Sequence, residues 1–451
     1  MSSAKTVFLC SECGAESRKW VGRCPGCGAW NTMMEEVAEK APSAAPVAPL
    51  AGADPLPLPD VPMEDFHRTM TGFGELDRVL GGGLVQGSLV LVGGDPGIGK
   101  STLLLQATEY IAQQGQLVLY VSGEESLRQI ALRARRLGAS SRNLRLLAET
   151  SVERILLQID RVQPAVIVID SIQTMYRTGM SSSAGSVTQV RESAASFMQL
   201  AKERGIPVLL VGHVTKAGTL AGPRVLEHMV DTVLSFEGDN MHAYRMLRAV
   251  KNRYGSTNEI GLFEMQEAGM VEITNPSELL LSERANSAGS IVVASVEGTR
   301  PVLVELQALV SSTSFGTPRR MATGVDYNRM ALLIAVLEKR AGLRLYDQDA
   351  YVNVAGGLKL DEPAIDLGIA LALASSLRGH ALPDGVAVFG EVGLTGEVRP
   401  VGRADLRVAE CVKSGFTTIV LPRRNLKGLA TPDGIELVGV DTVSMALGLL
   451  A

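Results

Sequence analysis

The sequence has no apolar run that approaches the 18 or more residues of a membrane-spanning helix. Its first residues, Met1 to Thr6, also lack the apolar core of a secretion signal. We therefore expect a cytoplasmic protein without a membrane partner. An excess of basic residues is missing too, because 43 Lys and Arg stand against 48 Asp and Glu in 451 residues, a formal net charge of -5. A global attraction to nucleic acid is excluded, so any such binding must come from local basic loops.

Cysteine is scarce, and four of the five cysteines fall within the first 27 residues. This distribution fits metal ligation in a reducing compartment better than a disulfide framework. The four form two C-x-x-C pairs ten residues apart, each followed by a glycine that permits a tight turn. Four thiolates so placed can close tetrahedrally on Zn²⁺, with no open position for catalysis. We predict a structural zinc ribbon over residues 1–32, ligated by Cys10, Cys13, Cys24 and Cys27.

Trp20 and Trp30, the only tryptophans, flank the second cysteine pair. We expect them to cover a small core that the metal otherwise holds together. The alternative is a platform for nucleic acid or for a partner protein. The fifth cysteine, Cys411, lies in an apolar helical pattern and is expected in a core. Residues 33–66 are rich in Pro and Ala without periodicity, which predicts an extended linker.

A phosphate-binding motif, G-x-x-x-x-G-K-[ST], occupies residues 94–101, between a buried-strand pattern at 88–93 and a helical pattern at 102–114. Its glycines let backbone N–H groups wrap a phosphate chain, and the positive end of the following helix points at that chain. The lysine reaches the outer phosphates, and the serine hydroxyl can hold Mg²⁺. We predict an ATP site formed by Gly94, Asp95, Pro96, Gly97, Ile98, Gly99, Lys100, Ser101 and Thr102.

Apolar strand patterns alternate with helical stretches after residue 84, as in a mostly parallel sheet with helices on both faces. The expected strands cover residues 89–92, 117–121, 144–147, 165–169, 208–211, 232–236 and 246–250. This alternation predicts an α/β domain, in which ligands gather at the carboxyl edge of the sheet.

Three acids and a histidine follow strands of that domain. Asp170 closes the apolar pattern at 166–170, where it can hold Mg²⁺ through water. Glu124, after the pattern at 118–122, is our candidate for polarising the attacking water, with Glu125 as the competitor. Either glutamate could also be an ordinary acid at a helix N-terminus. His213 follows the apolar pattern at 207–212, in position to sense the terminal phosphate.

The order GDPGIGKS, YVSGEES, VIVID, LLVGH and KNRYG, preceded by the paired cysteines, resembles the bacterial RadA (Sms) family of DNA repair proteins. That family is related to the recombinase RecA and to ring helicases of the DnaB type. The resemblance covers essentially the whole chain. It implies an α/β fold with three parts: the N-terminal zinc ribbon, a RecA-like P-loop ATPase over residues 67–285, and a Lon-protease-like α/β domain over residues 286–451.

By the same resemblance, Lys251 and Arg253 reach into the ATP site of a neighbouring subunit, where cations stabilise the charge of phosphoryl transfer. Without the resemblance, KNRYG fits a solvated basic turn as well. Loops at 177–187 and 214–225 match those that contact single-stranded DNA in RecA-like proteins. DNA binding is therefore expected at Lys216 and Arg224, and more weakly at Arg177, with plain mobile surface loops as the alternative.

Two C-terminal segments, 357–366 and 390–403, resemble the proteolytic domain of Lon, which uses a serine nucleophile and a lysine base. At the matching positions this chain has Ala364 and Asp405, so the resemblance implies a scaffold without peptidase activity. Scattered arginines are candidate DNA contacts in this domain, although such residues are usually just solvated. They are Arg319, Arg320, Arg399, Arg403 and Arg407.

Taken together, the residues predict an ATP hydrolase that uses Mg²⁺ and carries structural Zn²⁺. The resemblance adds the biological role: a DNA-dependent ATPase in homologous recombination and DNA repair, forming a ring that is expected to be hexameric. Its partners would be single-stranded and branched DNA and the recombinase RecA, whose strand exchange and branch migration it would promote. The alternative is an ATP-gated module that assembles on DNA or RecA without translocation.

Overall fold

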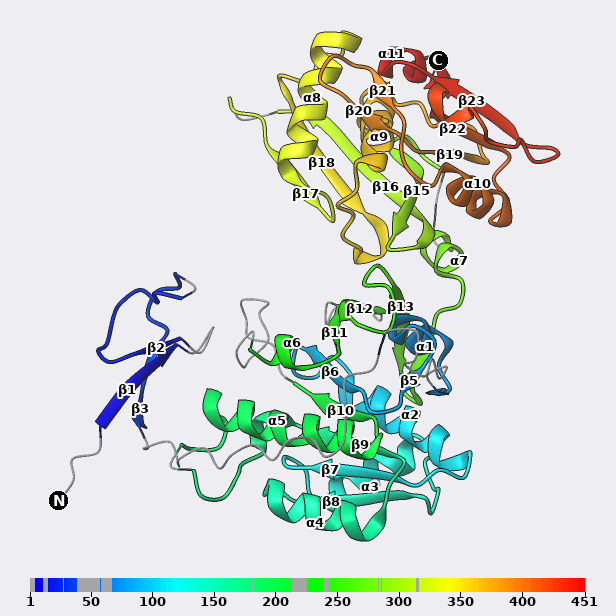
Figure 1. Ribbon diagram of the computed structural model, residues 1–451. Coiled ribbons are helices and arrows are strands. Elements are labelled where there is room, and N and C mark those ends of the chain that lie inside the picture. The colour runs from blue at the N-terminus through cyan, green and yellow to red at the C-terminus, as the bar shows by residue number, and fades with distance from the viewer. Residues whose placement is uncertain are drawn as a thin grey trace. The chain divides into compact units, whose positions relative to one another are not determined.

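A computed structural model describes residues 5–10, 15–26, 28–38, 57, 67–180, 182–212, 225–238, 244–282, 284, 286–313 and 316–450. The chain divides into two compact units, Met1–Glu272 and Ile273–Ala451 (Figure 1). Most of the predicted linker lies outside the described residues. So do five predicted site residues, which are Cys13, Cys27, His213, Lys216 and Arg224.

The N-terminal ribbon is a small antiparallel sheet of β1 (Lys5–Cys10), β2 (Glu16–Ser17) and β3 (Met33–Ala38), in the order β2-β1-β3. Strand β3 pairs with β1 along its whole length, from Cys10 opposite Met33 to Lys5 opposite Ala38. The ribbon therefore extends through Ala38. The sequence prediction ended it at residue 32 because the acidic, alanine-containing stretch that follows has no clear strand pattern.

The two tryptophans do not lie in the ribbon core, so the expectation that they cover it is wrong. Trp20 is 56% exposed and Trp30 is 70% exposed. Among the described residues, the core is formed by Cys10, Cys24 and Met33, and the partly buried side chains of Phe8, Ala15 and Val21 pack against it. A platform for a partner remains the open alternative for the two rings.

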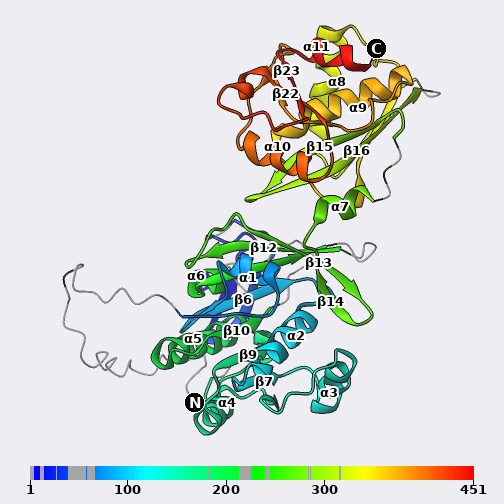
Figure 2. The same ribbon diagram turned by 90° about the vertical axis from the view of Figure 1, so that its right-hand side faces the viewer.

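The rest of the first unit is built on a nine-stranded sheet in the order β14-β13-β12-β11-β6-β10-β9-β7-β8 (Figure 2). Strands β11, β6, β10, β9, β7 and β8 are parallel to one another, and β12, β13 and β14 continue the sheet antiparallel. The bounds are β6 (Leu89–Gly94), β7 (Val118–Ser122), β8 (Leu144–Ala148), β9 (Val166–Asp170), β10 (Val208–Val211), β11 (Thr232–Glu237), β12 (Tyr244–Asn252), β13 (Ile260–Gln266) and β14 (Gly269–Glu272). A separate two-stranded sheet pairs β4 (Arg68–Thr69) with β5 (Leu84–Val85).

All seven strands predicted in this domain are present. Helices cover both faces of the sheet, as expected, because alternate residues of each buried strand point to opposite sides. One core contains α1 (Gly74–Leu80), α2 (Lys100–Gln113) and α3 (Leu127–Arg136). The other contains α4 (Val152–Val162), α5 (Val187–Arg204) and α6 (Val225–Met229). The sequence analysis missed β13 and β14, since they form a hairpin and break the alternation of strand and helix.

The second unit holds a seven-stranded mixed sheet in the order β17-β18-β16-β15-β19-β22-β23. Its strands are β15 (Ser290–Glu297), β16 (Arg300–Ser312), β17 (Arg320–Thr323), β18 (Gln348–Val354), β19 (Val386–Val388), β22 (Thr418–Pro422) and β23 (Glu436–Val440). A short hairpin of β20 (Glu391–Val392) and β21 (Val398–Arg399) lies outside this sheet.

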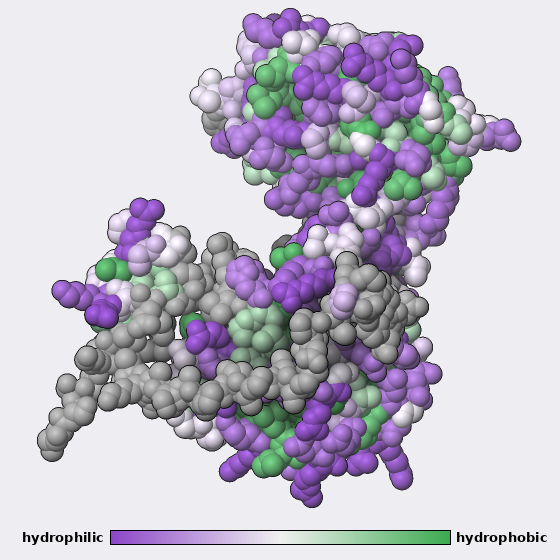
Figure 3. All heavy atoms as spheres, viewed as in Figure 1, coloured by the Kyte–Doolittle hydropathy of each residue, from purple (hydrophilic) through white to green (hydrophobic). Residues whose placement is uncertain are grey.

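Helices also cover both faces of the second sheet. The larger core includes α8 (Tyr327–Ala341), α9 (Asp366–Arg378) and α11 (Val443–Leu447), and the smaller one includes α10 (Ala404–Lys413). Cys411 is fully buried there, as predicted, and burial raises the pKa of its thiol to about 12. On the face seen in Figure 3, hydrophilic side chains cover most of this unit, with apolar ones scattered between them.

Helix α7 (Pro276–Leu281) packs against β16, so the second unit begins before the sequence-predicted boundary at 285/286. Ser277 fixes this packing, because its hydroxyl donates to Glu410 and accepts from the Leu303 N–H. Within the part of the chain that the structure describes, no helix is both long and apolar enough to cross a membrane.

Candidate nucleotide-binding and hydrolysis site

The predicted ATP-site residues of the first unit meet at one edge of its large sheet. The phosphate loop follows β6, Glu124 follows β7, and Asp170 ends β9. In register, Ser122 of β7 stands opposite Asp170, and Val92 of β6 stands opposite Val211 of β10. Since these strands are parallel, their carboxyl ends share this edge. His213 follows β10 at the same edge in the sequence, but it lies outside the described residues.

The phosphate loop has the backbone that its glycines were expected to provide. Gly97 has φ of +80° and Gly99 has φ of +115°, conformations that other residues rarely adopt. Residues 95–97 are exposed, whereas Ile98 is 1% exposed and anchors the loop in the core. Helix α2 begins at Lys100, earlier than the predicted residue 102, so the N–H groups of its first turn belong to the motif itself.

Lys100 turns inward into the loop. Its Nζ donates to the carbonyl oxygens of Gly94 (2.7 Å) and Asp95 (2.9 Å), and the residue is 4% exposed. Burial lowers the pKa of this ammonium, while the nearby carboxylates of Asp170, Asp95 and Glu124 oppose the shift. The lysine is therefore held at the centre of the loop by bonds that phosphate oxygens can replace.

The oxygen atoms at this edge suit Mg²⁺, which prefers oxygen ligands and is usually held by one or two carboxylates together with substrate phosphates. Asp170 supplies a carboxylate that is 7% exposed, and Ser101 supplies a half-buried hydroxyl at the start of α2. The Asp170 carboxylate also accepts a hydrogen bond of 2.6 Å from the Tyr120 hydroxyl. The residues present therefore fit the predicted roles of Ser101 and Asp170.

The structure distinguishes the two neighbouring glutamates. Glu125 forms a two-point ion pair with Arg133 of α3, with both N–O distances at 2.9 Å. Glu124 is exposed at the sheet edge and accepts a hydrogen bond from Ser171, the residue after Asp170. Because Glu125 is occupied by an arginine of the helix that follows it, Glu124 is the better candidate for activating water.

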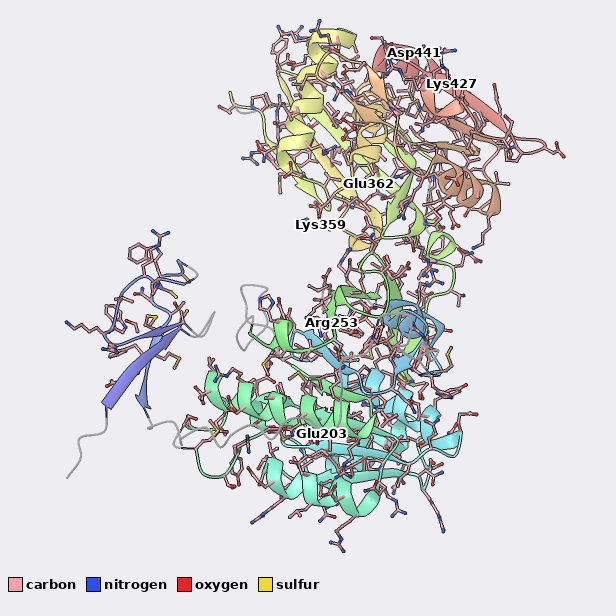
Figure 4. The ribbon with its side chains drawn as sticks, viewed as in Figure 1. Glu203, Arg253, Lys359, Glu362, Lys427 and Asp441 are labelled. Carbon is pink, nitrogen blue, oxygen red and sulfur yellow. The ribbon has the colours of Figure 1, made fainter. Side chains whose placement is uncertain are left out.

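Lys251 and Arg253 lie at the opposite edge of the sheet from their own phosphate loop. Near the end of β12, Asn252 stands opposite Thr232, which in turn pairs with Val90 at the start of β6. The phosphate loop follows the other end of β6. These two cations therefore cannot complete the ATP site of their own chain. Figure 4 labels Arg253.

Both cations are held by groups of their own chain. Lys251 Nζ donates to the carbonyl oxygens of Glu227 (2.7 Å) and Val230 (2.8 Å) at the end of α6, and burial lowers the pKa of its ammonium. Arg253 Nη1 lies 3.2 Å from an oxygen of Asp231. The KNRYG segment is thus a turn fixed by hydrogen bonds and an ion pair, and not only a solvated basic turn.

Sequence reasoning missed Asp231, the anchor of this turn. Its carboxylate is 3% exposed and lies 2.7 Å from Lys202 Nζ as well as 3.2 Å from Arg253. It also accepts from the Leu89 N–H over 3.0 Å, at the start of β6. Sequence reasoning also missed Tyr120 and Ser171. The signal available for Tyr120 was its place two residues before Ser122, at the carboxyl end of β7. That spacing puts both side chains on the face of the strand from which Asp170 projects on the neighbouring strand.

Arg177, the weakest DNA-contact prediction, lies after the carboxyl end of β9 but has an acidic neighbour. Its Nε is 3.6 Å from Glu153, and its side chain is 42% exposed. Gln189 fixes its backbone by accepting from the Arg177 N–H over 2.8 Å. A phosphate would have to compete with Glu153 for this guanidinium.

The described half of the zinc ribbon fits a metal site. Cys10 is 0% exposed and Cys24 is 3% exposed, and both thiols belong to one small core. Each starts a turn closed by the same bond, from Cys10 N to Ala15 O and from Cys24 N to Ala29 O. Cys13 and Cys27, the other two predicted ligands, lie outside the described residues.

The segments that resemble Lon come together in the second unit around Ala364, which is 2% exposed. Beside it, Glu362 (labelled in Figure 4) forms a two-point ion pair with Arg407 of α10, at 2.8 and 2.6 Å. Arg407 is 3% exposed, so its proposed DNA contact is wrong. Asp405 is exposed in the first turn of α10, and neither a hydroxyl nor an amine stands at the two positions matched to the peptidase.

The comparisons with known proteins follow the same three parts. Residues 8–35 match the family described as a rubredoxin metal binding domain, and residues 52–219 match an AAA domain. Residues 340–440 match the Lon protease (S16) C-terminal proteolytic domain.

Full-length relatives decide the family. The chain is 59% identical over 451 residues to the DNA repair protein RadA of Halalkalibacterium halodurans, covering 99% of both chains. It is 56% identical over 452 residues to the protein of the same name in Bacillus subtilis, again over 99% of both chains. The chain belongs to the RadA family of DNA repair proteins. The predicted fold class is confirmed: an α/β RecA-like ATPase core with an N-terminal zinc ribbon and a C-terminal Lon-like domain.

Among solved structures, a KaiC-like protein from Pyrococcus horikoshii OT3 is 20% identical to this RadA-family chain. It covers 46% of this chain and 100% of its own, with a TM-score of 0.39.

Replacing Cys24 by Ser is expected to abolish zinc binding, because a structural site needs all four ligands. Wild-type protein should carry about one zinc per chain. Cys411→Ala is the matched control: it also removes a buried thiol, but from the second unit, and should keep the metal. Metal analysis after purification without chelator measures both. Equal zinc in Cys24→Ser and wild type would contradict the ribbon.

Glu124→Gln is expected to lower ATP turnover by about 10²- to 10⁴-fold while ATP affinity is retained, because general-base catalysis is lost. Glu125→Gln is the matched neighbour and should cost far less, since its carboxylate serves Arg133. Steady-state hydrolysis and nucleotide-binding assays separate the two effects. A larger loss in Glu125→Gln than in Glu124→Gln would reverse the assignment.

Proposed function

We propose that this RadA-family protein is a DNA-stimulated ATP hydrolase that works in the cytoplasm in homologous recombination and DNA repair. It assembles as a ring, hexameric by resemblance, and moves on single-stranded and branched DNA. In doing so it promotes strand exchange and branch migration by RecA. The single observation that carries the proposal is the position of Lys251 and Arg253, at the sheet edge opposite their own phosphate loop.

That position supports a site completed between subunits. Two cations placed far from their own nucleotide can act on a nucleotide only if it belongs to another chain. A head-to-tail arrangement that closes into a ring supplies one such neighbour to every chain. Arg253 then stabilises the charge of phosphoryl transfer in trans, as arginine fingers do.

Within one subunit, different residues bind the phosphates, hold the metal ion and activate the attacking water. The N–H groups of the loop and of the first turn of α2 bind the phosphates, and Lys100 exchanges its carbonyl partners for outer phosphate oxygens. Ser101 and Asp170 hold Mg²⁺, which when bound neutralises phosphate charge. Glu124 orients the attacking water and takes its proton, while His213 senses the terminal phosphate.

DNA binding is proposed for the loops that follow β9 and β10. Lys216 and Arg224 neutralise phosphates there, and Arg177 contributes less because Glu153 lies beside it. In the sequence the second loop runs directly into α6, and Lys251 is held by the carbonyls of Glu227 in this helix and of Val230 just after it. This connection supports a link between the intersubunit site and the DNA loop.

The Lon-like domain is proposed to be a scaffold without peptidase activity that promotes ring assembly. Ala364 provides no nucleophile, and Asp405 provides no amine to activate one. The ion pair between Glu362 and Arg407 joins the segment that contains Ala364 to α10, the helix that contains Asp405. Arg319, Arg320, Arg399 and Arg403 stay candidate DNA contacts of this domain. A DNA phosphate would have to compete with Glu397 for Arg399 and with the Gly298 carbonyl for Arg403.

A direct test measures ATP hydrolysis with and without single-stranded DNA, and then strand displacement on a branched substrate. We expect stimulated turnover coupled to strand movement, and Lys100→Ala should abolish both. Stimulated turnover without strand movement would favour the alternative, an ATP-gated module that assembles on DNA or RecA. Turnover that ignores DNA would contradict both versions.

Mixing two inactive variants tests the trans contact. Lys100→Ala destroys the phosphate loop, whereas Arg253→Ala removes the finger and should cost about 10³-fold or more in turnover. In a one-to-one mixed ring, about one interface in four pairs an intact loop with an intact finger. We therefore expect about a quarter of wild-type turnover from the mixture, measured after co-assembly.

Lys202→Ala is the control for this experiment. It removes the other cation from Asp231 but leaves Arg253 in place, so it should keep most of the activity. No recovery in the mixture, with ring assembly verified, would contradict a finger supplied in trans. Loss of activity in Lys202→Ala equal to that in Arg253→Ala would assign the effect to the Asp231 anchor instead.

A further inference from the structure

Tyr120 is a buried residue whose polar end reaches the nucleotide site. It lies in the middle of β7 and is 0% exposed, with its ring in the core that contains α2. Its hydroxyl donates to Asp170 Oδ2 over 2.6 Å. A tyrosine used only to fill this core would not need that hydroxyl, since phenylalanine has nearly the same shape.

The strand register explains the contact. Ser122 stands opposite Asp170, and Tyr120 stands opposite Val168, so the side chains of Tyr120 and Asp170 project from the same face. The tyrosine is therefore a diagonal neighbour of the aspartate, at a spacing that a long aromatic side chain can bridge. The same face is covered by α2, whose first residue is Lys100.

The Tyr120 hydroxyl is the donor in this contact, and the Asp170 carboxylate is the acceptor. A hydrogen bond to a charged group is about twice as strong as a neutral one, so it restricts the rotation of the carboxylate.

We propose that Tyr120 is a positioning residue for Asp170: it occupies one carboxylate oxygen and leaves the other directed to the hydrated Mg²⁺ that accompanies ATP. This inference rests on the proposed function, because it concerns the same site. Partners of metal-holding groups commonly affect metal affinity by about tenfold or more.

The test measures metal-dependent nucleotide binding and not turnover. A fluorescent ATP analogue is titrated onto full-length protein in EDTA and across a range of Mg²⁺ concentrations. Tyr120→Phe should need about tenfold more Mg²⁺ for the half-maximal change in affinity, with affinity in EDTA unchanged. Asp170→Asn defines complete loss of the metal effect, and adding Tyr120→Phe to it should cause no further change.

Ser88→Ala is the matched control. The Ser88 hydroxyl is also buried and also donates over 2.6 Å, to the Val85 carbonyl, but at the start of β6. It should behave as wild type in the Mg²⁺ titration. Thermal unfolding of every variant is followed in parallel. If Tyr120→Phe is less stable because it leaves a buried carboxylate oxygen without its donor, Asp170→Asn should restore the unfolding temperature.

Several outcomes would overturn the inference. A Tyr120→Phe titration within about twofold of wild type would show that the hydroxyl does not position the carboxylate. An equal loss of affinity in EDTA and in Mg²⁺, or instability that Asp170→Asn does not relieve, would assign Tyr120 to the core alone. If wild-type protein binds nucleotide without any effect of Mg²⁺, the proposed function fails and this inference fails with it.

Discussion

Parallel pairing in the large sheet places the groups of the nucleotide site. Strands β6, β7, β9 and β10 run in one direction, so the chain leaves each of them at the same edge. Three of these strands bring different kinds of group to that edge: β6 leads to the N–H donors and Lys100, β7 leads to Glu124, and β9 ends with Asp170. None of these segments could bind and hydrolyse a nucleotide alone, and the edge supplies their common geometry.

The antiparallel strand β12 has the opposite consequence. It carries Lys251 and Arg253 to the far edge, where the buried carboxylate of Asp231 holds the turn and also binds the Leu89 N–H. Leu89 begins the strand that leads to the phosphate loop. Under the proposed function, the cations that contact the neighbouring subunit lie near the start of the buried strand β6, and the nucleotide of the same chain lies at its end. Because a close-packed interior transmits strain, a displacement at one end of β6 can reach the other.

Sequence reasoning predicted much of this arrangement because its signals are local. Seven strands and the phosphate loop follow from apolar runs and glycine spacing within short windows. The failures share a cause as well. The length of β3, the exposure of Trp20 and Trp30 and the burial of Arg407 each depend on contacts with segments distant in sequence. A solvent-exposed arginine and a buried arginine that pairs with a glutamate look the same in a sequence.

The sequence by itself determined which chemical groups the protein contains: the phosphate loop with Lys100 and Ser101, the acids Glu124 and Asp170, and the paired cysteines. It also determined that Ala364 provides no nucleophile. Only the tertiary structure decided how those groups are used. In the structure Glu125 forms an ion pair with Arg133, whereas Glu124 accepts a hydrogen bond from Ser171. Asp170 accepts one from Tyr120, and Lys251 lies far from the phosphate loop of its own chain. The reason is physical: spacing along the chain fixes the geometry of a loop, but the partner of a carboxylate is set by strand order and register.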